Sequence, residues 1–188
     1  TFSERAFLKH ASEERLENIP AYIVKKGDYI AEKKAARISV MSTDPGAYAG
    51  IDQKRIAKNQ AAMDKALRQV RKATQNNDLN WTVVSAADQA WAEKVFPEKK
   101  GQEAVDALWE EIFKTTRIDK ADPVKAWHEH IQKLHEKSDW LNKQQFSALH
   151  YVSPVTDITI GLPENHVWEA AGIFTPEGTE FIPNMPTE

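Results

Sequence analysis

The feature that most constrains this chain is a change of charge near residue 147. Residues 147–188 contain no Lys or Arg but carry six acidic residues, whereas all 25 basic residues lie in residues 1–146. The first part therefore has a formal net charge of +3 and the second part a formal net charge of −6. A shift in sign and composition of this kind marks a domain boundary. We therefore expect two units, residues 1–146 and residues 147–188.

Apolar residues before this boundary recur with the spacing of α-helices. Three stripes predict three helices, and their members are Ile56, Met63, Leu67 and Val70; Val105, Leu108, Trp109 and Ile112; and Val124, Trp127, Ile131 and Leu134. Asp52 is the expected N-cap of the first helix, and Asp122 followed by Pro123 marks the start of the third. Two short runs rich in β-branched residues, 36–41 and 81–85, lie between helical segments. This alternation predicts a layered α/β domain with parallel strands.

After the boundary the apolar pattern has a period of two. In residues 156–162, Ile158, Ile160 and Leu162 alternate with more polar positions. Turn residues at 163–165 and 175–178 separate further β-type segments at 166–168, 173–174 and 181–182. Small antiparallel hairpins need further strands or helices to cover their apolar face. We therefore expect the sequence to be cut through a second, β-rich domain, with its last β residues paired to a partner chain or disordered.

The composition excludes several classes of protein. The chain has no Cys, so it has no disulfide, no thiolate nucleophile and no cysteine-ligated metal. No segment approaches the roughly 18 apolar residues that cross a bilayer, so we expect no membrane partner. A pI near 6.1 gives no overall attraction to nucleic acid, so we expect no nucleic-acid partner. The seven glycines form neither a dinucleotide-binding nor a phosphate-binding motif.

The histidines of residues 127–135 resemble the start of a zinc-protease helix. The HExxH motif needs its second His where Gln132 stands, so this motif is incomplete. His128 and His135 are seven residues apart and could share one helix face, whereas His130 and His135 could not chelate comfortably. We interpret these residues as solvated histidines beside the apolar stripe that contains Trp127.

The predicted helix after Asp52 is strongly basic. Asp64 is the one acid within its body, against the bases Lys54, Arg55, Lys58, Lys65, Arg68, Arg71 and Lys72. Such a face is typical of a solvated outer surface, but it could also bind an anionic polymer or a membrane. A non-catalytic α/β interaction module that uses this helix is therefore the alternative hypothesis for the chain.

The acidic second part offers ligands for a divalent cation. The candidates are His150, Asp157, His166 and Glu188. Acids on the exposed face of an antiparallel sheet are common, so these residue types do not by themselves define a metal site.

Specific motifs in both parts resemble those of the thermophilic-type metalloaminopeptidases. In the second part they are residues 146–151 (FSALHY), 156–163 (TDITIGLP), 166–169 (HVWE) and 181–188 (FIPNMPTE). In the first part they are residues 41–46 (MSTDPG), 73–75 (ATQ), 81–82 (WT), 104–109 (AVDALW) and 122–127 (DPVKAW). The resemblance spans nearly the whole chain.

This resemblance implies a cytoplasmic exopeptidase of about twice this length that acts on peptides as a homodimer. Its N-terminal α/β domain would precede a β-rich catalytic domain that holds two divalent metal ions, commonly zinc or cobalt. Two glutamates, two histidines, a tyrosine and an aspartate ligate the metals in that family. Paired metals of this kind make a bridging water acidic and polarise the scissile carbonyl.

Glu188 is the metal-ligand candidate that the resemblance assigns to this sequence. The family's first glutamate ligand lies in a PTEE stretch, of which residues 186–188 are present here. The family continues with a second Glu, so the ligand is one of two adjacent residues. The other ligands come much later, and the family's first strand and helix lie before Thr1. We therefore expect the 188 residues alone to be catalytically inactive.

Overall fold

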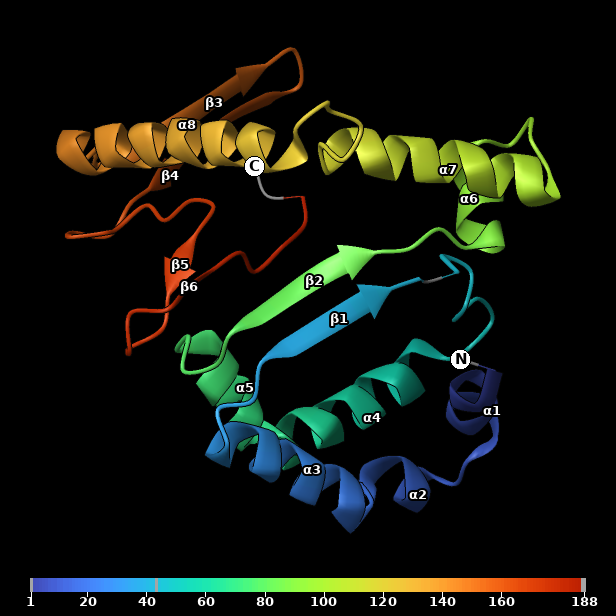
Figure 1. Ribbon diagram of the computed structural model, residues 1–188. Helices are drawn as coiled ribbons and strands as arrows, with labels where there is room; N and C mark the ends of the chain where they lie inside the picture. Colours follow the sequence, from blue (N-terminus) through green and yellow to red (C-terminus); the bar gives the residue numbers. More distant parts are fainter. Residues whose placement is uncertain (1, 43, 187–188) are drawn as a thin grey trace.

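A pair of parallel strands and the helices beside it organise the first half of the chain (Figure 1). The structure is a computed structural model that describes residues 2–42 and 44–186. The first elements in chain order are α1 (Phe2–His10), α2 (Glu13–Glu17), α3 (Ala21–Glu32), β1 (Arg37–Met41), α4 (Gln53–Ala66), α5 (Arg68–Gln75) and β2 (Trp81–Ser85). β1 and β2 pair in parallel, from Arg37 opposite Trp81 to Met41 opposite Ser85. The predicted parallel α/β arrangement is confirmed.

Two small clusters of buried side chains form the core of the first 146 residues. Leu8, Leu16 and Ile51 join α1 and α2 to the residues just before α4. A second cluster lies between α6 (Gln89–Val95) and α7 (Gly101–Thr115), where Leu108 and Ile112 of the predicted stripe are buried. The spacing of apolar residues therefore predicted α7 and its buried face correctly.

The basic stripe after Asp52 forms two helices, where the sequence predicted one. Asp52 does cap α4, because its side chain accepts a hydrogen bond from the Lys54 amide. The break falls at Leu67, between α4 and α5. Gly27 of α3 lies against this break, because a Cβ at Gly27 would lie only 2.8 Å from Leu67 Cδ2 and 3.3 Å from Val70 Cγ1. α3 and α5 therefore approach closely at this point.

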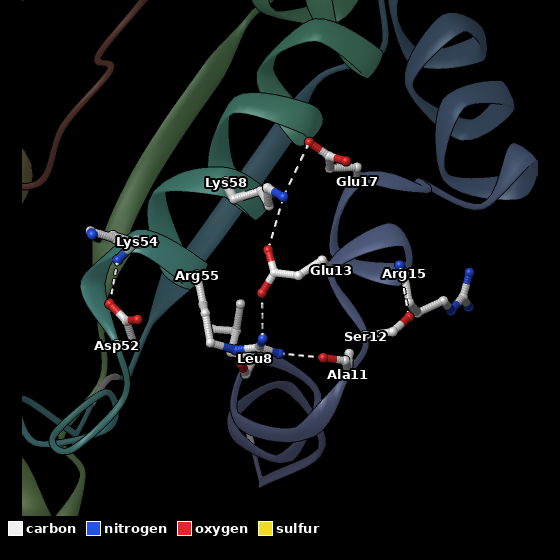
Figure 2. Close-up of polar contacts among 10 residues, drawn as sticks. All are labelled: Leu8, Ala11, Ser12, Glu13, Arg15, Glu17, Asp52, Lys54, Arg55 and Lys58. Atoms are coloured by element: carbon white, nitrogen blue, oxygen red, sulfur yellow. Dashed lines mark hydrogen bonds and ion pairs between the residues drawn. The ribbon is translucent and has the colours of Figure 1, made fainter.

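Arg55 of α4 connects this helix to α1 and α2 (Figure 2). Its Nε donates to the carbonyl oxygen of Leu8 at 2.8 Å, and its guanidinium also donates to the carbonyl oxygen of Ala11. The same side chain forms an ion pair with Glu13 at 2.7 Å. Because Arg55 binds the carbonyl groups at the end of α1, it satisfies acceptors that the helix leaves unpaired.

Helix α8 (Pro123–Gln144) links the first part of the chain to the second. The Asp122 side chain accepts a hydrogen bond from the Lys125 amide at 3.0 Å, which confirms the predicted N-cap. Its apolar stripe is less buried than the pattern predicted, since Val124 is 65% exposed. None of the helices within the described ranges is long and apolar enough to cross a membrane.

The second part contains two antiparallel hairpins. β3 (Ala148–Ser153) pairs with β4 (Thr156–Gly161), and β5 (Ile173–Phe174) pairs with β6 (Glu180–Phe181). The strand predicted at 166–168 is wrong, because these residues form a loop. The backbone N–H and carbonyl of Trp168 both bind the Asn142 side chain of α8, and the carbonyl of His166 accepts from Gln145. These side chains occupy backbone groups that a neighbouring strand would need.

Residues 183–185 return to the first part of the chain and lie beside β2. The Val83 amide donates to the Pro183 carbonyl at 2.8 Å, and the Met185 amide donates to the Val83 carbonyl at 2.9 Å. The contact is a parallel bridge between Val83 and Asn184. The prediction that the last β residues pair with a partner chain or are disordered is therefore wrong for these residues.

Candidate functional site

The segment 183–186 places the end of the described chain at the carboxyl edge of the parallel sheet. Val83 lies in the middle of β2, and the bridged segment runs in the same direction as β1 and β2. In open α/β sheets, ligands bind outside the carboxyl ends of the strands. Glu188, the predicted metal ligand, lies outside the described residues, two positions after this segment.

Two other acids at this edge have structural partners. Asp44 follows β1, and its Oδ1 accepts a hydrogen bond from the Gly46 amide at 2.7 Å. Asp88 follows β2 and is the N-cap of α6, with its Oδ1 accepting from the Ala90 amide at 2.9 Å. Both carboxylates stabilise local turns, which accounts for their positions without a bound ligand.

The other candidate ligands of the acidic part do not converge. His150 and Asp157 face each other across β3 and β4, with Nε2 and Oδ1 2.7 Å apart, and both side chains are more than half exposed. His166 lies in the loop after β4, and its Nδ1 is 2.9 Å from the Pro163 carbonyl oxygen. Among residues 2–42 and 44–186, no group of three or more His, Asp or Glu side chains could hold a metal ion. The described residues alone therefore do not fit a two-metal site.

The loop that contains His166 is nevertheless held in a defined position. Asn142 binds both backbone groups of Trp168, at 2.9 and 2.7 Å. The rings of His166 and Trp168 pack edge to face, with centroids 5.8 Å apart. Asn142 therefore fixes the HVW motif to the end of α8, a tertiary contact that no sequence pattern signalled.

The histidines of α8 do not form a zinc site in the described part of the chain. His128 and His135 line one groove, as their spacing of seven predicted. His130 faces elsewhere, with its Nδ1 2.9 Å from Arg117 Nη2. The Arg117 guanidinium also lies over the Trp127 ring, 5.3 Å from the ring centroid.

The basic helix face is partly neutralised within the chain. Lys58 forms ion pairs with Glu13 at 2.8 Å and with Glu17 at 3.7 Å. The hydrogen bond between Lys58 and Glu13 raises the pKa of Lys58 and lowers the pKa of Glu13. Arg55 pairs with the same glutamate and Arg71 pairs with Asp64. These contacts remove three of the seven bases from an anion-binding surface, which weakens the alternative hypothesis of a basic interaction module.

A groove between α8 and the β5–β6 hairpin was not anticipated from the sequence. It has a volume of about 820 Å³ and is lined by side chains from both elements, including His135, Asp139, Phe174 and Glu180. The turn residues at 175–178 predicted the hairpin, but nothing in the sequence indicated that it would lie beside α8.

Comparison with known proteins identifies the class to which this fold and these motifs belong. The sequence matches the family described as thermophilic metalloprotease (M29) over residues 1–188. The chain therefore belongs to this family of metalloproteases, which confirms the resemblance found in its motifs.

Individual relatives match along almost the entire chain. The chain is 48% identical to Aminopeptidase PepS of Streptococcus thermophilus over 189 residues, covering 100% of this chain and 46% of the relative. It is 49% identical to Aminopeptidase AmpS of Bacillus subtilis (strain 168), covering 93% of this chain and 43% of the relative. The solved structure titled wild-type AmpT from Thermus thermophilus aligns with a TM-score of 0.88 and 36% identity, covering 100% of this chain and 46% of that one. The α/β fold class is thereby confirmed, and the chain spans less than half the length of these relatives.

Proposed function

We propose that the protein containing these 188 residues is an aminopeptidase that removes N-terminal residues from peptides. The whole protein would use two divalent metal ions, zinc or cobalt, whose chemistry when bound is to make a water molecule acidic and to polarise the scissile carbonyl. The observation that carries this proposal is the 48% identity to an aminopeptidase over the full length of the chain. Membership of a metalloprotease family supports the requirement for metal.

Glu188 is the proposed metal ligand within this sequence. Carboxylate oxygens are suitable ligands for divalent ions and can bridge two of them. The hydrogen bonds between Val83 and residues 183 and 185 support this assignment, because they fix the chain just before Glu188 to a strand of the sheet. A ligand that follows a fixed segment loses less conformational freedom when it binds a metal.

The organisation of the whole protein follows from the same proposal. Residues 1–146 would form most of an N-terminal α/β domain, and residues 147–188 would begin the metal-binding catalytic domain. The change from a net charge of +3 to a net charge of −6 supports this division. The protein would act on peptides in the cytoplasm as a homodimer.

The function can be tested on the full-length protein with leucine p-nitroanilide as substrate. We expect hydrolysis that a chelator abolishes and that added zinc or cobalt restores. Glu188→Gln should lower kcat/KM more than about 100-fold, because loss of even an outer-shell group costs 10–100-fold. Glu169→Gln removes another acid of the same lysine-free segment and serves as the matched control. Full activity of the Glu188→Gln protein would contradict the assignment of the ligand.

The isolated 188-residue chain provides a second test. We propose that it is inactive, because the resemblance assigns one glutamate, two histidines, a tyrosine and an aspartate to positions after Glu188. Metal analysis by mass spectrometry and the anilide assay on the same sample check this. Stoichiometric zinc together with hydrolysis would contradict it.

A further inference from the structure

The groove between α8 and the β5–β6 hairpin is a candidate binding site outside the proposed metal centre. We refer to it as the α8 groove, and its volume is about 820 Å³. Figure 1 shows α8 above the β5–β6 hairpin. The residues that line it include His135, Glu136, Asp139, Phe174, Glu180 and Phe181.

The α8 groove carries an excess of negative charge. Glu136, Asp139 and Glu180 contribute carboxylates, and no Lys or Arg lines the groove. Glu136 accepts a hydrogen bond from Gln132 at 2.9 Å, whereas Asp139 and Glu180 form no ion pair with any residue that the structure describes. A concave surface lined by charges of one sign concentrates ligands of the opposite sign.

Aromatic side chains form the apolar part of the same groove. Phe174 is 57% exposed, and Phe181 is half-buried against Trp81, with ring centroids 6.3 Å apart. Aromatic faces attract ammonium and guanidinium groups and also accommodate the aliphatic stems of Lys and Arg. Carboxylates beside phenylalanines therefore match the chemistry of a lysine or arginine side chain.

Two bases of α8 line a different pocket, which shares Glu136 with the α8 groove. Lys133 and Lys137 line a separate pocket of about 460 Å³, together with Arg117 and Trp140. Neither lysine forms an ion pair within the described part of the chain. Glu136 therefore lies between these lysines and the α8 groove, whereas Asp139 and Glu180 line the groove alone.

We propose that the α8 groove binds a lysine or arginine side chain of a peptide substrate, on the carboxyl side of the bond that is cut. This inference rests on the proposed function, which makes peptides the substrates. Ile182 lines the groove and precedes Glu188 by six residues, and six residues of chain span at most about 21 Å. An extended peptide with its N-terminus at Glu188 can cover this distance, so the groove would bind one of its first seven residues.

Matched peptides test this specificity in the full-length protein. We expect kcat/KM for Leu-Ala-Lys-Ala-Lys-Ala to exceed that for Leu-Ala-Glu-Ala-Glu-Ala by about five- to tenfold at low salt, since each exposed charge contact contributes only modestly. The ratio should decrease at 0.5 M NaCl, because added salt shortens the Debye length and screens the interaction between exposed charges. In the Asp139→Asn, Glu180→Gln double variant it should fall to about one. Glu129→Gln, which removes an acid of α8 outside the groove, should keep the original ratio.

Direct binding separates the groove from the catalytic activity. An N-acetylated, fluorescein-labelled Phe-Lys-Phe-Lys peptide has no free N-terminus to be removed, and its affinity can be measured by anisotropy. We expect the double variant to weaken its binding by about fivefold and Glu129→Gln to leave binding unchanged.

The combined outcomes distinguish the two proposals. If the protein hydrolyses leucine p-nitroanilide but does not distinguish the lysine from the glutamate peptide, the groove proposal is wrong and the function stands. If the anilide is not hydrolysed but the labelled peptide binds and the double variant weakens it, the groove binds cationic peptides and the proposed function is wrong. Equal binding by the parent protein and the double variant overturns the groove proposal in either case.

Discussion

The two parts of this chain contain strand pairs of about equal length that differ in how far they are covered. In the parallel pair β1–β2, every residue of β2 is half-buried beside the helices, although Ile38 and Val40 of β1 are 75% and 62% exposed. In the antiparallel pair β3–β4, every residue of β4 is exposed, and Val155 at the turn is 93% exposed. A hairpin can form from neighbouring residues, whereas a parallel pair needs a crossover that itself packs on the sheet. The first part is therefore stabilised by its core, and the second part depends on a few contacts with the first.

The largest expected effect of this difference concerns the free energy of unfolding. Leu16→Ala would leave a cavity in the cluster with Leu8 and Ile51 and should destabilise the chain by about 2–5 kcal/mol. Val155→Ala should change stability by no more than about 0.5 kcal/mol, because its side chain is already in solvent. Urea denaturation of the full-length protein and of both variants measures the two values. Similar losses in both variants would show that the hairpin is buried in the native protein.

A smaller, local effect is expected from Asn142, which attaches the second part to α8. Asn142→Ala removes both hydrogen bonds to the Trp168 backbone and should cost about 1–2 kcal/mol locally. Hydrogen exchange of residues 163–168 should become faster by about five- to thirtyfold, while the exchange of β2 stays the same. Lys143→Ala, at the next position of α8, is the matched control. Unchanged exchange of the loop in Asn142→Ala would mean that other contacts hold it.

The smallest effect concerns the ion pair between Lys34, just after α3, and Glu177 in the β5–β6 turn. The hydrogen bond and charge of Lys34 lower the pKa of Glu177 below its ordinary value of 4.5. The contribution of this carboxylate is therefore fully present above pH 4.5 and is lost as the pH falls through the lowered pKa. Hydrogen exchange of residues 175–179 should accelerate over this range in the parent protein but not in Glu177→Gln. Glu164→Gln, in the other turn, should retain the pH dependence of the parent.

The elements that the sequence predicted well are those defined by local chemistry. The N-caps Asp52 and Asp122, the buried face of α7 and both parallel strands follow from capping and periodicity alone. Helices α1, α2, α3 and α6 were not predicted. α1 and α2 each contribute a single buried apolar residue, Leu8 and Leu16, which is too few to form a visible stripe.

The features that the sequence did not predict depend on contacts between distant residues. The break at Leu67 lies where α3 approaches closely at Gly27, and the loop at 166–168 is held by Asn142 of α8 and by Gln145, the C-cap of that helix. The α8 groove likewise exists only because the β5–β6 hairpin lies beside α8. The sequence indicated which residue types could bind a metal ion. Only the fold shows that the described candidates do not come together in a group that could hold one.

The bridge between Val83 and Asn184 has a consequence for how the chain folds. The two residues are about a hundred positions apart, so closing this loop costs conformational entropy. The hydrogen bonds that offset this cost can form only when β2 is already in place. Contacts of such long range form late and slow the folding of a domain. The acidic end of the chain would therefore reach its position only after the first sheet has assembled.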